Sequence, residues 1–467
     1  MEAGKQAGAR LIRTGKENKN MSALRFLWLV LSLCTSLAMA QAGRSAEEES
    51  AEFVGHIRSA LRPLTQADDD YGPLIQAIGD ARIVLLGEAT HGSREFYRER
   101  ARITRRLIVE EGFDAIVLEG DWVPLRRIDA YVRGRGSDPS GVDALLRIRR
   151  FPRWPWRNTE FQQFAEQLLA INAALPQPLR VAVYGMDLYA VPDAAREVIA
   201  YLDSVDPSAA AQARSRYRCF LRYENDPEAY GRNLAARKIR SCRTSAEMQF
   251  RELSRRMARS AGVPDEALFS AWQSARVVKS AEAYFRALYG KKTSSWNVRD
   301  RHMAQTIDAI MKQHVFSGRA GKVVVWAHNS HQGDARMTAH AAAGELSLGQ
   351  LMRERFGERA VLVGFSTYSG SVRAATEWGG IDEVKILLPA LPESFSALMH
   401  EAGTPEFLLM CRGVLEEKRD AERLERAVGV LYLPDSERES HYYPVRLTRQ
   451  FDALIHIDTT TALDVLD

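Results

Sequence analysis

The sequence lacks the short motifs that identify several large enzyme classes. It contains no Gly-x-Ser-x-Gly nucleophile elbow, no Walker A loop, no Gly-x-Gly-x-x-Gly after an apolar run and no His-Glu-x-x-His. Cysteine is also scarce, with four in 467 residues, at spacings that fit no zinc motif. These absences argue against a serine hydrolase built on that elbow, a P-loop nucleotidase, a dinucleotide-dependent enzyme and a zinc protease of the usual sequence type.

An excess of charge of one sign is also missing from most of the chain. The sequence has 64 Lys and Arg against 60 Asp and Glu, but residues 1–40 hold six of the basic and two of the acidic side chains, so the rest carries 58 of each sign. Without net positive charge, nucleic-acid binding loses its electrostatic basis. Hydrophobic residues make up 46% and charged residues 27%, which is typical of a folded globular protein.

Residues 1–40 are predicted to be a secretory signal peptide. Basic residues precede the apolar run 26–33, and Ala38-Met39-Ala40 fits the small-residue cleavage pattern, so cleavage is expected after Ala40. Met21 is an alternative start, because residues 21–40 alone already have these features. The prediction is a periplasmic or secreted protein that does not contact the membrane once the signal is removed. The alternative is a retained anchor, for which the apolar run is short.

Three cysteines remain after the predicted cleavage site. Cys219 and Cys242 lie in one helical stretch and would be able to form a disulfide in an oxidising compartment, with Cys411 outside the pair. The sequence leaves this pairing open.

Short apolar runs predict buried strands. Five are clear, and three more would extend the sheet. The clear ones are 82–87, 114–118, 179–184, 322–327 and 360–365, and the others are 406–410, 428–433 and 452–457. A helix from an N-cap at Ser93 to about Glu111 joins the first two strands, so that pair is expected to be parallel with a right-handed crossover.

The order of these elements predicts an α/β fold, with a mainly parallel central sheet flanked by helices. Residues 41–78 are expected to form an N-terminal segment, and residues 79–192 and 318–467 the α/β core. Residues 193–317 contain no convincing strand and are rich in Ala, Arg, Glu and Gln with helical spacing. This stretch predicts an all-helical insertion.

Polar residues follow several predicted strands directly. The first strand is followed by Glu88 and His91, the second by Glu119, and the fourth by His328 and His331. Ligands of open α/β sheets bind beyond the carboxyl ends of the strands, so these side chains are expected to converge there. Imidazoles beside carboxylates are suited to general-base activation of water. Two alternatives stay open: each residue alone is explained by structure, and the histidines together are able to bind a divalent metal.

At these residues the sequence resembles the erythromycin esterase family. The segments that carry the resemblance run in the family's order from about residue 80 to the C-terminus. They are LLGEATHG (85–92), FYRERARITRRLIVEEGFDAIVLEGDW (96–122), WNVRDRHMAQTIDAI (296–310), VVVWAHNSHQGDAR (323–336), ELSLGQLMRERFG (345–357) and FDALIHIDTTTAL (451–463).

The resemblance implies a hydrolase that opens a macrolactone ester with a histidine-activated water and needs no cofactor. His91 is the expected general base, oriented by Glu88 or Glu119, and His328 is an alternative base. Arg100 and His331 would polarise the carbonyl or stabilise the oxyanion. These positions match the family's site by motif.

The family is broader than its resistance enzymes, so the substrate is expected to be a macrolide or another bulky lactone or ester. The helical insertion would cover the crevice as a lid and select the substrate. Two other functions stay open: a metal-dependent hydrolase of an ester or glycan, and a non-enzymatic protein that binds haem or another ligand through these histidines. Oligomeric state is not predicted by any feature of the sequence.

Overall fold

The computed structural model describes residues 47–260, 262–290, 294–411 and 422–466. The predicted signal peptide, residues 1–40, therefore lies outside the described residues. Among the described residues, 47–55 belong to one unit and those from His56 onward to a second. The sheet, its flanking helices and the candidate site all belong to the second unit.

In the described part of the chain, nine strands form one mixed sheet, in the order β1-β8-β11-β6-β2-β5-β3-β4, with β7 paired to β6. Neighbouring strands from β11 to β4 are parallel, whereas β1, β8 and β7 are antiparallel to their neighbours. Strands β9 and β10 form a separate antiparallel pair. The strands are β1 (Arg62–Pro63), β2 (Ile83–Leu86), β3 (Ala115–Asp121), β4 (Ala182–Asp187), β5 (Val323–Trp326), β6 (Ala360–Ala375), β7 (Asp382–Leu387), β8 (Glu406–Met410), β9 (Arg423–Arg426), β10 (Tyr442–Val445) and β11 (Ala453–Thr460).

Helices connect the parallel strands and flank the sheet. The helices are α2 (Gly72–Ile78), α3 (Arg94–Val109), α4 (Trp122–Val132), α5 (Gly141–Leu145), α6 (Thr159–Ala173), α7 (Val191–Val205), α8 (Pro207–Leu221), α9 (Pro227–Ala235), α10 (Arg243–Arg259), α11 (Glu266–Leu288), α12 (Ser295–Phe316), α13 (Asn329–Gln332), α14 (Leu348–Phe356), α15 (Phe395–Glu401), α16 (Glu437–His441) and α17 (Leu447–Gln450). The 3₁₀ helices are η1 (Gln177–Leu179), η2 (Ala335–Met337), η3 (Ala339–Ala343), η4 (Gly357–Arg359) and η5 (Pro434–Ser436).

The centre of the sheet is apolar and buried, which confirms the predicted α/β class. Every residue of β2 and β5 is buried, as expected of parallel strands that are covered on both faces. Helix α3 begins directly after Ser93, as predicted, and buries Phe96, Ile103 and Leu107 against this core. The parallel strands thus rest on a continuous core that fixes where their carboxyl ends lie.

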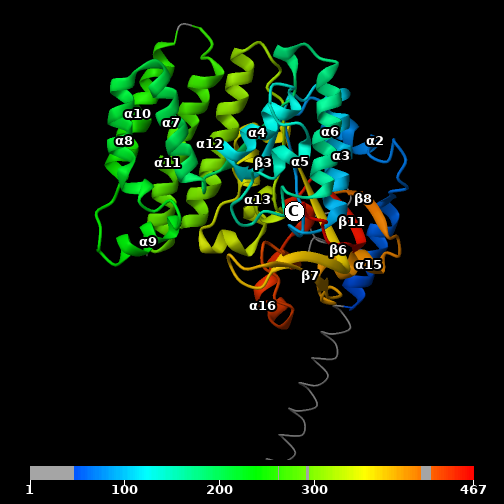
Figure 1. The fold of residues 1–467 in the computed structure, drawn as a ribbon. Coiled ribbons are helices and arrows are strands. Elements are labelled where there is room, and N and C mark those ends of the chain that lie inside the picture. The colour runs from blue at the N-terminus through cyan, green and yellow to red at the C-terminus, as the bar shows by residue number, and fades with distance from the viewer. Residues whose placement is uncertain (1–46, 261, 291–293, 412–421, 467) are drawn as a thin grey trace, which may run out of the picture. The chain divides into compact units, whose positions relative to one another are not determined.

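The stretch predicted to be helical contains α7 to α12, and its described residues hold no strand. Figure 1 shows α7 to α11 grouped together beside α12. Cys219 and Cys242 form a disulfide between α8 and the start of α10, and Cys411 is buried. No helix in the described ranges is both long and apolar enough to span a membrane.

Three strand predictions need correction. The run 428–433 is not a strand: it is apolar because Val428 and Tyr432 pack in a small buried cluster with β6 and β7. The run 179–184 begins with η1, and its strand starts at Ala182 and ends at Asp187. The predicted strand at 360–365 continues to Ala375, because its second half pairs with β7.

Candidate active site

The carboxyl ends of four adjacent parallel strands bring the candidate residues together. The sheet order places β2, β5, β3 and β4 side by side. Glu88 and His91 follow β2, Glu119 lies near the end of β3, Asp187 ends β4, and His328 follows β5. Candidate side chains from segments far apart in the sequence therefore meet at one edge of the sheet, where open α/β folds bind ligands.

A cavity of about 400 Å³ opens at this edge. Four of the six predicted site residues line it, namely His91, Glu119, His328 and His331. Other lining residues come from the β4–α7 connection, the α5–α6 connection, the start of α12, η3, the β6–β7 turn and the segment 427–443; they include Arg149, Arg150, Trp156, Tyr189, Trp296, Arg299, His340, Trp378, Gly429 and Tyr443.

His91 is held through one ring nitrogen and presents its ring to the cavity. Its Nδ1 lies 2.7 Å from Glu88 Oε1, and its side chain is 14% exposed. Burial by itself lowers the pKa of His91. The hydrogen bond to Glu88 and the negative charges of Glu119 and Glu88 outweigh burial, so the pKa of His91 is raised above its ordinary value. With Nδ1 engaged by a carboxylate, Nε2 is the atom available to a ligand.

Arg100 lies behind Glu88 and does not reach the cavity. Its Nη2 is 2.7 Å from Glu88 Oε2, and its side chain is fully buried with the guanidinium over the rings of Tyr97 and Trp326. The geometry disfavours the expected role of Arg100 at the carbonyl or oxyanion, because its guanidinium does not line the cavity. Its contact is with Glu88, whose charge and position it stabilises.

His328 has both ring nitrogens engaged. The backbone N–H of Ser330 donates to His328 Nδ1 over 3.2 Å, so the ring proton sits on Nε2, which lies 3.3 Å from the carbonyl oxygen of Ala89. Burial and the neighbouring charge of His91 lower the pKa of His328 to about 3. A neutral ring whose only unprotonated nitrogen already accepts a hydrogen bond is a poor general base. The geometry therefore disfavours the alternative in which His328 activates water.

His331 is also engaged on both sides. Its Nδ1 lies 3.0 Å from Asp300 Oδ1, its Nε2 lies 2.6 Å from Arg299 Nη1, and its ring stacks on Trp296 with centroids 4.2 Å apart. Because arginine has only donors, Nε2 is the acceptor and Nδ1 carries the proton that is donated to Asp300. His331 thus serves to hold Arg299 in place.

The positive charge of Arg299 is paired with two carboxylates of the site, Glu119 and Asp187. Its Nη2 lies 2.7 Å from Glu119 Oε1 and 2.7 Å from Asp187 Oδ2, and its Nε lies 3.0 Å from Asp187 Oδ1. Burial raises the pKa values of both acids, but His331 and Arg299 lower that of Glu119, and Arg299 lowers that of Asp187, so both stay ionised. A guanidinium has five donors. One N–H of Nη1 has no hydrogen-bond partner in the described structure and remains for a ligand in the cavity.

Sequence reasoning missed Arg299, Asp300 and Trp296. All three begin the segment WNVRDRHMAQTIDAI, which carries part of the family resemblance, and that resemblance was the available signal. Asp187 follows a predicted strand directly, so its position was predictable, although its pairing with Arg299 was not. Nothing in the sequence points to Tyr443, because it enters the cavity from a short strand that pairs away from the main sheet.

The helical stretch 193–317 contributes only the start of α12 to the described cavity walls, through Trp296 and Arg299. Helices α7 to α11 provide no lining residue among those described. The α5–α6 connection and the segment 427–443 each contribute more lining residues than the helical stretch does.

The hydrogen bonds of the cavity histidines fit metal or haem binding less well than they fit general-base catalysis. In the described ranges no group of three or more His, Cys, Asp or Glu side chains is arranged to hold a metal ion. For His91, His328 and His331 to act together as ligands, His328 would have to give up its contacts to Ser330 and Ala89, and His331 its contact to Arg299 or Asp300.

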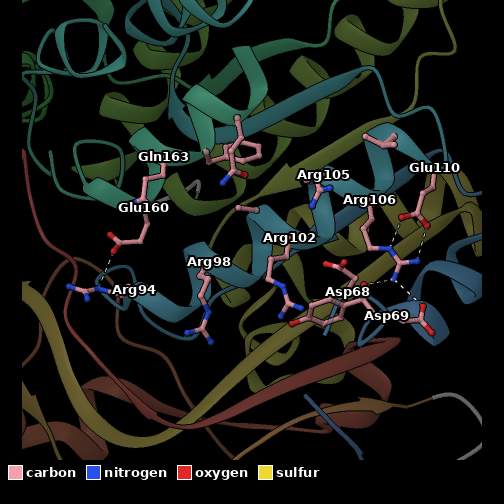
Figure 2. Close-up of a pocket in the computed structure, with 15 residues that line it drawn as sticks. Asp68, Asp69, Arg94, Arg98, Arg102, Arg105, Arg106, Glu110, Glu160 and Gln163 are labelled. Carbon is pink, nitrogen blue, oxygen red and sulfur yellow. Dashed lines mark hydrogen bonds and ion pairs between the residues drawn. The ribbon is translucent and has the colours of Figure 1, made fainter. Parts of the chain in front are cut away.

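A larger groove, of about 620 Å³, runs along α3 away from these histidines. Figure 2 shows a row of arginines on α3 in this groove: Arg94, Arg98, Arg102, Arg105 and Arg106. Four of the five are paired with carboxylates, for example Arg94 with Glu160 at 3.0 Å and Arg106 with Glu110 at 2.7 Å. These four arginines of the groove therefore form ion pairs that link α3 to neighbouring side chains. The described lining of the groove does not include the histidines that gather at the sheet edge.

A family model for erythromycin esterase matches residues 108–460 of this chain. The chain belongs to the erythromycin esterase family. Family membership supports an esterase-like hydrolase. The matched range contains Glu119, Arg299, His328 and His331, and it starts after His91.

One relative of known name is the erythromycin esterase type II of Escherichia coli. It is 34% identical over 83 residues, which make up 18% of this chain and 20% of the relative. The matched stretch thus spans about a fifth of the relative's length.

Solved structures share the fold of this family member. A Bacillus cereus protein has a TM-score of 0.73 at 20% identity and covers 89% of this chain and 99% of its own. A succinoglycan biosynthesis protein has a TM-score of 0.72 at 22% identity over 89% of this chain and 98% of its own. A mutant of the erythromycin esterase EreC in its open conformation has a TM-score of 0.61 at 17% identity, over 85% of this chain and 95% of its own. At these identities the likeness concerns the fold.

Proposed function

We propose that the protein hydrolyses a carboxylic ester with a water molecule that His91 activates. The observation that carries this proposal is the pairing of His91 with Glu88: Nδ1 is bound to a carboxylate at 2.7 Å while the ring faces the cavity. Of the three histidines named by the family resemblance, His91 alone has a ring nitrogen without a hydrogen-bond partner in the described structure.

In the proposed reaction His91 Nε2 takes a proton from water as the water oxygen attacks the ester carbon. The charge that develops on the carbonyl oxygen is stabilised by the remaining N–H of Arg299 Nη1, which lies in the cavity wall. Glu88 keeps the imidazolium in place, and Arg100 in turn holds Glu88. Collapse of the tetrahedral intermediate breaks the bond to the alcohol oxygen and leaves a carboxylic acid and an alcohol.

The proposed substrate is a macrolactone or another bulky ester. The names of the Escherichia coli relative and of EreC support a macrolide, and opening of a macrolide ring would confer resistance to that drug. Three aromatic side chains line the cavity and support an apolar substrate, namely Trp156, Trp296 and Trp378. The name of the succinoglycan biosynthesis protein supports an acylated glycan as the next substrate to test.

The test is mass spectrometry of erythromycin incubated with the purified chain and with His91→Ala. A matched control is His400→Gln, since His400 also binds a carboxylate through Nδ1, at 2.7 Å from Asp458, but does not line the cavity. We expect a gain of one water with the wild type and the control, and a loss of about 10³-fold in rate for His91→Ala at a nearly unchanged melting temperature.

If no macrolide, lactone or acylated glycan gains water, the ester hydrolase proposal fails. If the wild type loses its activity with a chelator and recovers it with Mn²⁺ or Zn²⁺, the metal-dependent alternative replaces the mechanism proposed here. A Soret shift with haem, in the absence of any turnover, would favour the binding protein.

A further inference from the structure

Four histidines line the cavity, and their hydrogen bonds leave two of them with an open ring nitrogen. His328 and His331 have both nitrogens engaged, as described above. His91 and His340 each bind a carboxylate through Nδ1, and within the described residues Nε2 of neither ring has a hydrogen-bond partner. The proposed function uses His91 and gives no role to His340.

The surroundings of His340 repeat those of His91. His340 lies in η3, and its Nδ1 is 3.1 Å from Glu345 Oε2. Its ring packs against Tyr443, with centroids 4.7 Å apart, and lies parallel to Trp296 at 6.4 Å. These contacts fix the ring within the cavity wall. The side chain of His340 is 38% exposed, so its ring is also able to exchange protons with solvent.

Hydrolysis of an alkyl ester moves protons at two places. One proton leaves the attacking water, and one must reach the departing alcohol oxygen, because an alkoxide is a poor leaving group. His91 receives the first proton and is held in its charged form by Glu88 and Glu119. A second histidine with a carboxylate at Nδ1 and an open Nε2 on the same cavity is suited to supply the second proton.

We propose that His340 protonates the departing alcohol oxygen, with Glu345 as its positioning residue. This inference rests on the proposed ester hydrolysis. As the carbon–oxygen bond of the tetrahedral intermediate breaks, its electron pair stays on the alcohol oxygen, which takes the proton from Nε2 of the His340 imidazolium. His340 becomes neutral, His91 keeps the proton from water, and both rings return to their starting states by exchange with solvent. The net reaction consumes one water and yields an acid and an alcohol.

The experiment compares two esters of the same acid, ethyl butyrate and p-nitrophenyl butyrate, with the wild type and with His340→Gln. The p-nitrophenolate ion leaves without a proton, whereas ethoxide needs one. We expect the ratio of kcat/KM for the ethyl ester to kcat/KM for the nitrophenyl ester to fall about 10²-fold in His340→Gln. Glu345→Gln should lower the same ratio by a smaller factor, and the control His400→Gln should leave it unchanged.

A second variant, His340→Ala, removes the ring, and added imidazole should restore part of its activity on the ethyl ester. Equal losses on both esters would overturn the inference, because a merely structural role would affect both substrates alike. Unchanged kcat/KM on both esters would also overturn it and would assign the second proton transfer to His91. If the wild type hydrolyses neither ester nor any lactone, the proposed function itself fails, and the inference fails with it.

Discussion

Arg299 Nη1 lies 2.6 Å from His331 Nε2, and this contact joins the start of α12 to α13, the short helix that follows β5. The same guanidinium bridges Glu119 at the end of β3 and Asp187 at the end of β4. One side chain therefore connects the carboxyl ends of three parallel strands. The site is held together by Arg299, although its proposed base is His91.

Arg299→Gln is expected to destabilise the protein as well as inactivate it. Removing the guanidinium leaves two buried carboxylates without their partner, and loss of one member of a buried ion pair typically costs about 3–5 kcal/mol. Chemical denaturation with kcat/KM measurements checks both effects. Arg299→Lys keeps the charge but not the forked geometry, so it should recover more stability than activity. Unchanged stability in Arg299→Gln would contradict the bridging role.

The pH dependence of hydrolysis should follow the ionisation of His91. With p-nitrophenyl butyrate, whose leaving group needs no proton, only the base must be in its neutral form, so kcat/KM is expected to rise with pH through a pKa above the ordinary value of 6.5. The raised pKa also means that protonated His91 stabilises the fold below pH 6.5, and that this contribution is lost as pH rises through the folded-state pKa.

Glu88→Gln should move the pH profile to lower pH. The substitution removes a hydrogen bond and a charge that both raise the pKa of His91, so the midpoint of the rise should fall, with a loss of about 10²-fold in kcat. Rate measurements across the rise give both quantities. A midpoint that stays in place would show that another group is the base.

The sequence predicts the central strands because they are continuous apolar runs buried on both faces, as at β2 and β5. The same rule fails at 428–433, where apolar residues pack against β6 and β7 and the backbone makes isolated bridges, among them Leu431 with Ala375, but forms no strand. Strand β7 is not predictable from burial, since Val384 and Ile386 are exposed at 60% and 77%. Its pairing with β6 is set by the chain reversal between them.

The pairing of Glu88 with His91 was predictable because both residues follow the same strand, three positions apart. The contact between Arg299 and His331 was not predictable. The two residues are 32 positions apart in the sequence, and the distance between them in space depends on the whole fold. For Arg100 the motif and the geometry point to different roles. Its motif position suggests a ligand contact, but the helix that carries it faces the core, so the side chain stops at Glu88.

The disulfide provides a test of the proposed export. We propose that residues 1–40 direct the chain to an oxidising compartment, where Cys219 and Cys242 pair. Protein recovered from the periplasm should begin at Gln41, and its Cys219 and Cys242 should resist alkylation until they are reduced. Reduction should lower the unfolding free energy by about 3 kcal/mol, as expected for a closed loop of roughly 20 residues. Full-length cytoplasmic protein with reactive thiols at both positions would contradict export.

Glu425 is a buried acid whose hydrogen-bond partners in the described structure, Asn329, Tyr443 and Gln450, are all neutral. Its carboxylate accepts from Asn329 Nδ2 at 2.9 Å and from the hydroxyl of Tyr443 at 3.0 Å. Burial outweighs these hydrogen bonds and raises the pKa of Glu425 to about 7. Because the unfolded pKa is lower, the stability that the protonated form provides is lost as pH rises through the folded-state value.

Glu425→Gln should therefore gain stability relative to the wild type as pH increases. The difference between an ordinary pKa of 4.5 and a folded-state pKa of about 7 corresponds to about 3 kcal/mol of unfolding free energy. Urea denaturation of both proteins at about pH 5 and about pH 8 measures it, since the glutamine stays neutral at both. A constant difference between the two proteins would show that Glu425 keeps one protonation state over this range, and that its three neutral donors, Asn329, Tyr443 and Gln450, are enough to hold it ionised.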